Sequence, residues 1–169
     1  MNRIVIFCCF IFCVMGFAQN RTQPATQAQE LGKVSWYRDF DQALALSRKQ
    51  NKPIFVLFQE VPGCLTCRNY GKGVLSNAVI VKTIEEHFIP LVIFNNKRGK
   101  DNAVLKRYGE PSWNNPMVRI IDAKGENLIR RIAGDYSKSR VAQEMLGVLE
   151  KQQKVVSSDL RNLASGLRY

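Results

Sequence analysis

The segment IFVLFQEVPGCLTC, residues 54–67, constrains the fold more than any other part of the chain. Its first five residues are all apolar, and a short continuous apolar run is typical of a strand buried on both faces. Cys64 and Cys67 follow at a spacing of three, which places both on one side of a helix that begins there. The segment therefore predicts a buried strand that leads directly into a cysteine pair at a helix N-terminus.

Residues 1–18 have the pattern of a secretory signal peptide. A basic start at Arg3 precedes an unbroken apolar run over 4–14, and Gly16-Phe17-Ala18 supplies a small-x-small cleavage motif. We expect cleavage after Ala18 and a periplasmic or secreted location. The alternative is an uncleaved N-terminal anchor, although the apolar run is shorter than the ~20 residues that span a bilayer.

Cleavage would remove three of the five cysteines and leave Cys64 and Cys67. Disulfides persist in exported proteins, but a bond that closes so small a loop contributes little to stability. A single closely spaced cysteine pair favours redox chemistry and leaves two alternatives open. One is an inert disulfide. The other is a carrier that holds a metal or a partner without redox turnover, with Cu(I) bound through both cysteines and His87, the only histidine. A structural zinc site is disfavoured because it needs four ligands.

The remaining patterns define one domain. Residues 19–34 are polar and predict a flexible leader, 35–152 form the domain, and 153–169 are a tail whose leucines indicate further helical turns. The expected elements of the domain are, in order, a helix from Ser35 to Lys49, strand 54–58, a helix from the cysteines, helix 77–87, strand 88–94, helix 101–108, strands 116–122 and 127–133, and a helix from Ser137 to Leu149. This order predicts an α/β fold with a single mixed sheet flanked by helices.

The chain is strongly basic, with 25 Lys and Arg against 14 Asp and Glu and a net charge of +11. A basic surface can bind nucleic acid or anionic lipid. The basic residues are spread along the chain without interleaved aromatic residues, and export argues against nucleic acid. We interpret the charge mainly as a solvated surface and expect no nucleic-acid partner.

The position of the cysteine pair assigns a role to each thiol. A thiolate is the reactive form, and the N–H groups and dipole of a helix N-terminus lower the thiol pKa. Cys64 falls in the first turn and is the predicted nucleophile. Cys67, one turn later, can attack a mixed disulfide formed by Cys64 and is the predicted resolving thiol. Arg68 either adds positive charge beside the pair or is a solvated helix residue.

A proline at the start of a later strand sharpens the interpretation. Trp113-Asn114-Asn115-Pro116 directly precedes the apolar run MVRII, and proline is tolerated at the first residue of a strand. Together with the buried strand and the cysteine pair, this pattern resembles the thioredoxin fold from about Trp36 to Leu149. The resemblance implies that Pro116 is the cis proline that packs against the cysteines. It also implies that the Asn115 backbone holds a substrate segment. Trp113 is a further candidate for substrate contact because it is close in sequence.

A narrower resemblance rests on VPGC followed by YG, VLS, FIPL, NN and YGEPSWNNPMVR. These stretches are similar to a group of exported bacterial thioredoxin-like proteins, some with selenocysteine at the first cysteine position. The similarity implies that Cys64 is the reactive position. The chain departs from thioredoxins at Gly63, where an aromatic residue is usual, at Leu65-Thr66, where Gly-Pro is usual, and at Phe58, where a buried acid is usual. Glu60 is the nearest carboxylate that could assist proton transfer.

The predicted function is that of an exported thiol–disulfide oxidoreductase acting on protein or small-molecule disulfides. It would need no bound cofactor or metal, because electrons would pass to or from another dithiol protein. A reductase would further need an electron donor, which we expect in the membrane. We expect the protein to be a monomer.

Overall fold

The computed structural model describes residues 21–113 and 116–166. In these residues the sheet has three strands in the order β2-β1-β3. β1 pairs parallel with β2 and antiparallel with β3. The elements along the chain are η1 (Gln29–Leu31), α1 (Phe40–Gln50), β1 (Ile54–Gln59), α2 (Leu65–Gly73), α3 (Ala78–His87), β2 (Ile89–Phe94), α4 (Lys100–Tyr108), β3 (Met117–Ile121), α5 (Lys138–Lys151) and α6 (Ser158–Ala164).

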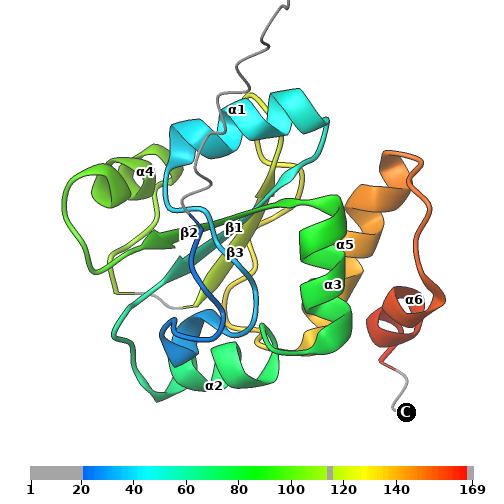
Figure 1. The fold of residues 1–169 in the computed structure, drawn as a ribbon, viewed down its shortest axis with the longest axis horizontal. Helices are drawn as coiled ribbons and strands as arrows, with labels where there is room; N and C mark the ends of the chain where they lie inside the picture. The colour runs from blue at the N-terminus through cyan, green and yellow to red at the C-terminus, as the bar shows by residue number, and fades with distance from the viewer. Residues whose placement is uncertain (1–20, 114–115, 167–169) are drawn as a thin grey trace, which may run out of the picture.

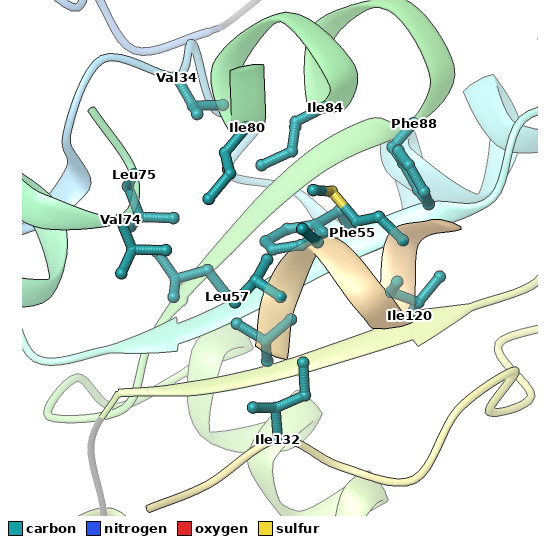
Figure 2. Packing of buried hydrophobic residues seen from close by; sticks show 14 of the residues in the cluster. Val34, Phe55, Leu57, Val74, Leu75, Ile80, Ile84, Phe88, Ile120 and Ile132 are labelled. Carbon is teal, nitrogen blue, oxygen red and sulfur yellow. The ribbon is translucent and has the colours of Figure 1, made fainter. Parts of the chain in front are cut away.

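Helices cover both faces of the sheet, with α1 and α4 on one face and α3 and α5 on the other (Figure 1). β1 is buried along its whole length and supplies side chains to both layers. Successive strand side chains point to opposite faces. Ile54, Val56 and Phe58 therefore enter the core under α1 and α4. Phe55 and Leu57 enter the other core, where they meet side chains of α3 and β3 (Figure 2).

The predicted α/β fold with a single mixed sheet is confirmed, and so are most of its elements. Asn77 caps α3 by accepting hydrogen bonds from the Val79 and Ile80 N–H groups, and Ser137 caps α5 through the Arg140 N–H group. Gly109 ends α4 in the left-handed conformation that glycine adopts without strain.

The first long helix starts later than predicted. It begins at Phe40 and not at Ser35, because Asp39 is the capping residue and its carboxylate accepts the Gln42 N–H at 3.0 Å. The preceding backbone is extended and lies beside β2. There Tyr37 donates its N–H to Pro90 and accepts the Val92 N–H.

The predicted strand over 127–133 is not continuous. It meets β3 through two isolated bridges, Ile121 with Asn127 and Val118 with Ile132. These bridges are three residues apart on β3 but five apart on the facing segment. Two extra residues therefore bulge out of the ladder, which interrupts strand pairing.

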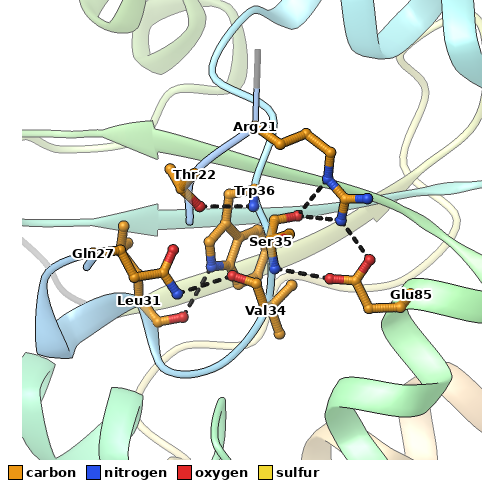
Figure 3. A network of polar contacts seen from close by, with 8 residues as sticks. All are labelled: Arg21, Thr22, Gln27, Leu31, Val34, Ser35, Trp36 and Glu85. Atoms are coloured by element: carbon orange, nitrogen blue, oxygen red, sulfur yellow. Dashed lines mark hydrogen bonds and ion pairs between the residues drawn. The ribbon is translucent and has the colours of Figure 1, made fainter. Parts of the chain in front are cut away.

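Residues 21–34 are packed against the domain, in contrast to the flexible leader expected over 19–34. The Arg21 guanidinium binds the Ser35 carbonyl and the Glu85 carboxylate, and Glu85 also accepts the Ser35 N–H at 2.8 Å (Figure 3). Leu31 and Val34 are buried in the core. The polar composition of residues 21–34 gave no sign of this packing, because only a few apolar side chains of the segment are buried.

The tail expected to begin at 153 contributes a further helix to the domain. α6 packs against α5 and α3, and its Leu160 and Ala164 are buried. The predicted signal peptide, residues 1–18, lies outside the described residues. Within the described ranges, none of the helices combines the length and apolar character needed to cross a membrane.

Gly71 and Gly73 of α2 provide a test of how the N-terminal segment packs. A Cβ at Gly71 would lie 2.1 Å from the Gln29 carbonyl oxygen, whereas a Cβ at Gly73 would meet nothing within 4 Å. We expect Gly71→Ala to lower the free energy of unfolding by about 1–3 kcal/mol through overpacking. Gly73→Ala should leave it unchanged or raise it by up to about 1 kcal/mol, since alanine favours helix. Urea unfolding of both variants measures the difference, and equal effects would contradict this packing.

Candidate active site

Cys64 is the N-cap residue of α2, at the point where the chain leaves the end of β1. Its side chain is exposed. Hydrogen bonds from the Cys67 backbone N–H and, secondarily, from the Cys67 thiol and from Thr66 lower the pKa of the Cys64 thiol below its ordinary value. The first N–H groups of a helix have no partner within the helix, so they are available to stabilise a thiolate. The arrangement makes Cys64 an accessible and activated thiol.

Cys67 lies behind Cys64 and is fully buried. The two sulfur atoms are 3.4 Å apart and are not joined by a disulfide bond. Burial, together with the neighbouring Cys64, raises the pKa of the Cys67 thiol to about 11. The pair is therefore asymmetric, with one exposed thiol that ionises easily and one buried thiol that does not.

Gly63 explains how the loop fits closely over Cys67. A Cβ at this position would lie 2.6 Å from the Glu60 carbonyl oxygen and 2.7 Å from the Cys67 Cβ. Any side chain at Gly63 would push the loop away from the buried cysteine. The Arg68 guanidinium donates to the Gly63 carbonyl at 3.1 Å, so Arg68 contacts the loop and is more than a solvated residue.

The residue of β1 that faces α2 is Gln59, because strand side chains alternate. Phe58 points to the opposite face, where its ring meets Tyr108 edge-on at 6.1 Å. Gln59 is fully buried, and its Nε2 donates to the Cys67 carbonyl at 3.2 Å. A neutral amide therefore lies beneath the pair. Glu60 has a carboxylate oxygen within 4.8 Å of both sulfur atoms.

Pro116 lies at the same edge of the sheet as the cysteine loop. Met117, the first residue of β3, is the register partner of Phe58 near the end of β1, and Pro116 directly precedes it and is buried. Trp113 is 77% exposed. Asn115, including its predicted cis bond to Pro116, lies outside the described residues.

The loop that leads to Trp113 is held by a buried carboxylate. The Glu110 side chain is fully buried and accepts a hydrogen bond from the Arg119 Nε at 2.7 Å. The Arg131 Nε lies 3.5 Å from its other oxygen. Two guanidinium groups thus compensate the buried charge. They fix the start of the loop to β3 and to the segment beside it.

The three-ligand copper site with His87 is not formed. His87 is the last residue of α3 and precedes β2, whereas the cysteines follow β1. Because β1 and β2 are parallel, these positions are at opposite ends of the sheet. In the part of the chain that the structure describes, the cluster of three metal-ligand side chains at the site consists of Glu60, Cys64 and Cys67.

Three residues of this site were not among its predicted members. Glu30 is buried under the cysteine loop, Gln59 lies beneath Cys67, and Leu65 is 65% exposed beside Cys64. Strand alternation could have identified Gln59, and position next to the nucleophile could have identified Leu65. Nothing in the polar stretch around Glu30 distinguishes it from its neighbours, because its contacts come from the tertiary fold.

A buried strand, a cysteine pair at a helix N-terminus and a strand-initial proline at one sheet edge define a thioredoxin-like architecture. A family model described as thioredoxin-like matches residues 35–123, more than half of the chain, and the protein belongs to this family. No curated protein is significantly similar to the chain in sequence.

Several solved structures have a similar fold, among them the following three. A protein described as DsbH oxidoreductase has a TM-score of 0.59 and 18% identity, with 74% of this chain and 90% of that one covered. A thioredoxin from Thermus thermophilus has a TM-score of 0.58 and 19% identity, with coverage of 69% and 88%. A putative disulphide-isomerase from Bacteroides thetaiotaomicron has a TM-score of 0.55 and 21% identity, with coverage of 76% and 100%. At these identities the likeness shows the fold.

The opposite pKa shifts of the two thiols predict selective alkylation. In the reduced protein at neutral pH, iodoacetamide should label Cys64 at least about a hundredfold faster than Cys67, given a Cys67 pKa of about 11. The midpoint of the rise in the Cys64 rate with pH should lie below that of an ordinary thiol, whereas the rate at Cys67 should still rise above pH 10. Mass analysis of the labelled peptides measures both rates. Equal labelling at neutral pH would contradict the asymmetry.

Proposed function

We propose that the protein is an exported thiol–disulfide oxidoreductase in which Cys64 attacks and Cys67 resolves. The observation that carries this proposal is the asymmetric pair, with an exposed Cys64 at the helix N-terminus and a buried Cys67 whose sulfur lies 3.4 Å away. Thiol–disulfide exchange requires these two properties, a reactive outer thiolate and a second thiol within reach. Family membership and the oxidoreductase and isomerase descriptions of structural neighbours support it at the general level.

In the reducing direction the Cys64 thiolate attacks one sulfur of a substrate disulfide. A Cys64–substrate disulfide forms, and the other substrate sulfur leaves as a thiolate that takes up a proton. Cys67 then loses its proton and attacks the Cys64 sulfur, and the sulfur–sulfur distance shortens from 3.4 Å to the bond length of about 2.05 Å. The second substrate thiolate is released. Two electrons have passed from the cysteine pair to the substrate, and the oxidising direction reverses every step.

We assign Glu60 as the base that takes the proton of the Cys67 thiol. The raised pKa of Cys67 means that this thiol needs a base before it can attack. Gln59, which lies beneath it, is a neutral amide without basic character. The half-exposed Glu60 has a carboxylate oxygen within 4.8 Å of both sulfurs, so it can take the proton directly or through one water and pass it to solvent.

The surface around Cys64 suits an extended polypeptide segment that carries a disulfide. Leu65 and Trp113 are two of the three exposed large apolar side chains in the described residues. They flank the site on the α2 side and on the loop before β3. Pro116, with the Asn115 backbone, would form the wall between them. We assign Pro116, Asn115 and Trp113 to substrate binding and place Leu65 with them.

Export and electron supply complete the proposal. The signal-peptide pattern of residues 1–18 supports a periplasmic or secreted location. The partner would be another dithiol or disulfide protein, and a membrane electron donor is needed if the protein works as a reductase. Within the thioredoxin-like family, we place the chain in the group of exported bacterial proteins with a Val-Pro-Gly-Cys or selenocysteine motif.

Two serine substitutions test the assigned roles of the cysteines. Cys64→Ser should abolish insulin-disulfide reduction, because no thiolate remains at the exposed position. Cys67→Ser should also stop turnover, but it should accumulate a mixed disulfide between Cys64 and insulin, visible as a heavier species on a non-reducing gel. Activity of Cys64→Ser equal to that of the unmodified protein would refute the mechanism.

A further inference from the structure

We infer that Glu30, in the N-terminal segment, is a positioning residue of the active site: its carboxylate holds the loop that carries Cys64. This inference rests on the proposed redox function and extends it to a residue outside the region that the family model matches. The observation behind it is a hydrogen bond from the Gly63 N–H to the Glu30 Oε1, 2.8 Å long. Gly63 is the residue directly before Cys64.

The contact is the firmest polar restraint on this loop among the described residues. The other side of the loop is held by Asn96, whose contacts with Val61 and Pro62 are 3.4–3.5 Å long and exposed. The Arg68 contact with the Gly63 carbonyl is 3.1 Å long and also exposed. Glu30, in contrast, is only 5% exposed. A charge-assisted hydrogen bond at a largely buried carboxylate is stronger than the long, neutral contacts of Asn96 and than the Arg68 bond, whose charge is screened by solvent.

Glu30 is itself fixed by the elements that form the site. Its backbone carbonyl accepts the Gln59 Nε2 at 2.8 Å, and the same amide nitrogen donates to the Cys67 carbonyl at 3.2 Å. Gly71 of α2 lies against the backbone of Glu30, where a Cβ would come within 2.6 Å of its carbonyl carbon. Glu30 therefore connects the end of β1, the cysteine loop and α2.

The consequence for chemistry follows from the N–H groups that stabilise the Cys64 thiolate. These bonds require the Cys64 sulfur to stay over the first turn of α2, and the preceding residue sets the direction in which the chain enters that turn. If the Gly63 N–H lost its acceptor, the loop would move more freely and the sulfur would spend less time at the N–H groups. The titratable or charged groups near this sulfur or the loop before it are Cys67, Glu60, Arg68 and Glu30 itself. A negative charge on Glu30 disfavours a thiolate, so loss of that charge alone would lower the Cys64 pKa. A fall in Cys64 reactivity in Glu30→Ala therefore reports lost positioning and not lost charge.

The test compares the pH profile of Cys64 alkylation in the full chain and in three variants, read on the Cys64 peptide. Glu30→Ala removes the acceptor and should lower the alkylation rate at pH 7 about five- to tenfold and move the midpoint to higher pH. Glu30→Gln keeps an oxygen acceptor and should retain at least about half of the unmodified rate.

Glu85→Ala is the matched control. It removes the carboxylate that binds Arg21 and the Ser35 N–H at the other end of the N-terminal segment (Figure 3). Glu85→Ala should lower the melting temperature but leave the Cys64 profile unchanged. Any of three results would overturn the inference. The Cys64 profile could be unchanged in Glu30→Ala, Glu30→Gln could lose as much reactivity as Glu30→Ala, or Glu85→Ala could shift the profile as far as Glu30→Ala does.

Amide hydrogen exchange of the unmodified protein provides a second test that does not depend on a variant's folding. The Gly63 amide should be protected by at least about a hundredfold, because its hydrogen bond is made to a buried acceptor. Exchange at the rate of an unprotected amide would overturn the inference. A protein without any disulfide-exchange activity would refute the proposed function, and it would leave the Gly63 protection unaffected.

Discussion

The chemistry of this protein depends on the stabilisation of one sulfur atom by the N-terminus of α2. The Cys67 N–H is the largest contribution to lowering the pKa of the Cys64 thiol. It acts only while the chain passes from β1 into the helix along a tight path over Cys67. Gly63 permits that path because it has no side chain to strike Cys67.

The strands and helix ends whose signals lie within their own segments could be predicted from the sequence. Apolar runs identified β1 and β2, and Asn77, Gly109 and Ser137 marked helix ends correctly, because these residues act through their own backbone neighbours. The predicted start of α1 at Ser35 was wrong, because Asp39 is the capping residue and Tyr37 pairs with β2. Tertiary pairing of this kind has no signal within the segment itself.

The site was predictable where it depends on spacing and was missed where it depends on packing. The i,i+3 spacing put Cys67 one turn after Cys64 and within reach of it, and the two sulfur atoms lie 3.4 Å apart. The substitution of the buried acid by Phe58 was visible, but its consequence was not, because strand register puts Gln59 beneath the pair. Glu30 reaches the loop from a segment that appeared to be a flexible leader. The packing of that segment makes the active site larger than the residues that the family model matches.

The reduction potential of the Cys64–Cys67 pair tests the central claim most directly. It can be measured by equilibrating the protein in glutathione and dithiothreitol buffers, trapping free thiols by alkylation and analysing the peptide that carries both cysteines. An activated outer thiolate predicts a value between about −120 and −270 mV, the range of known redox catalysts. A value far below about −300 mV is typical of structural disulfides and would contradict a catalytic role.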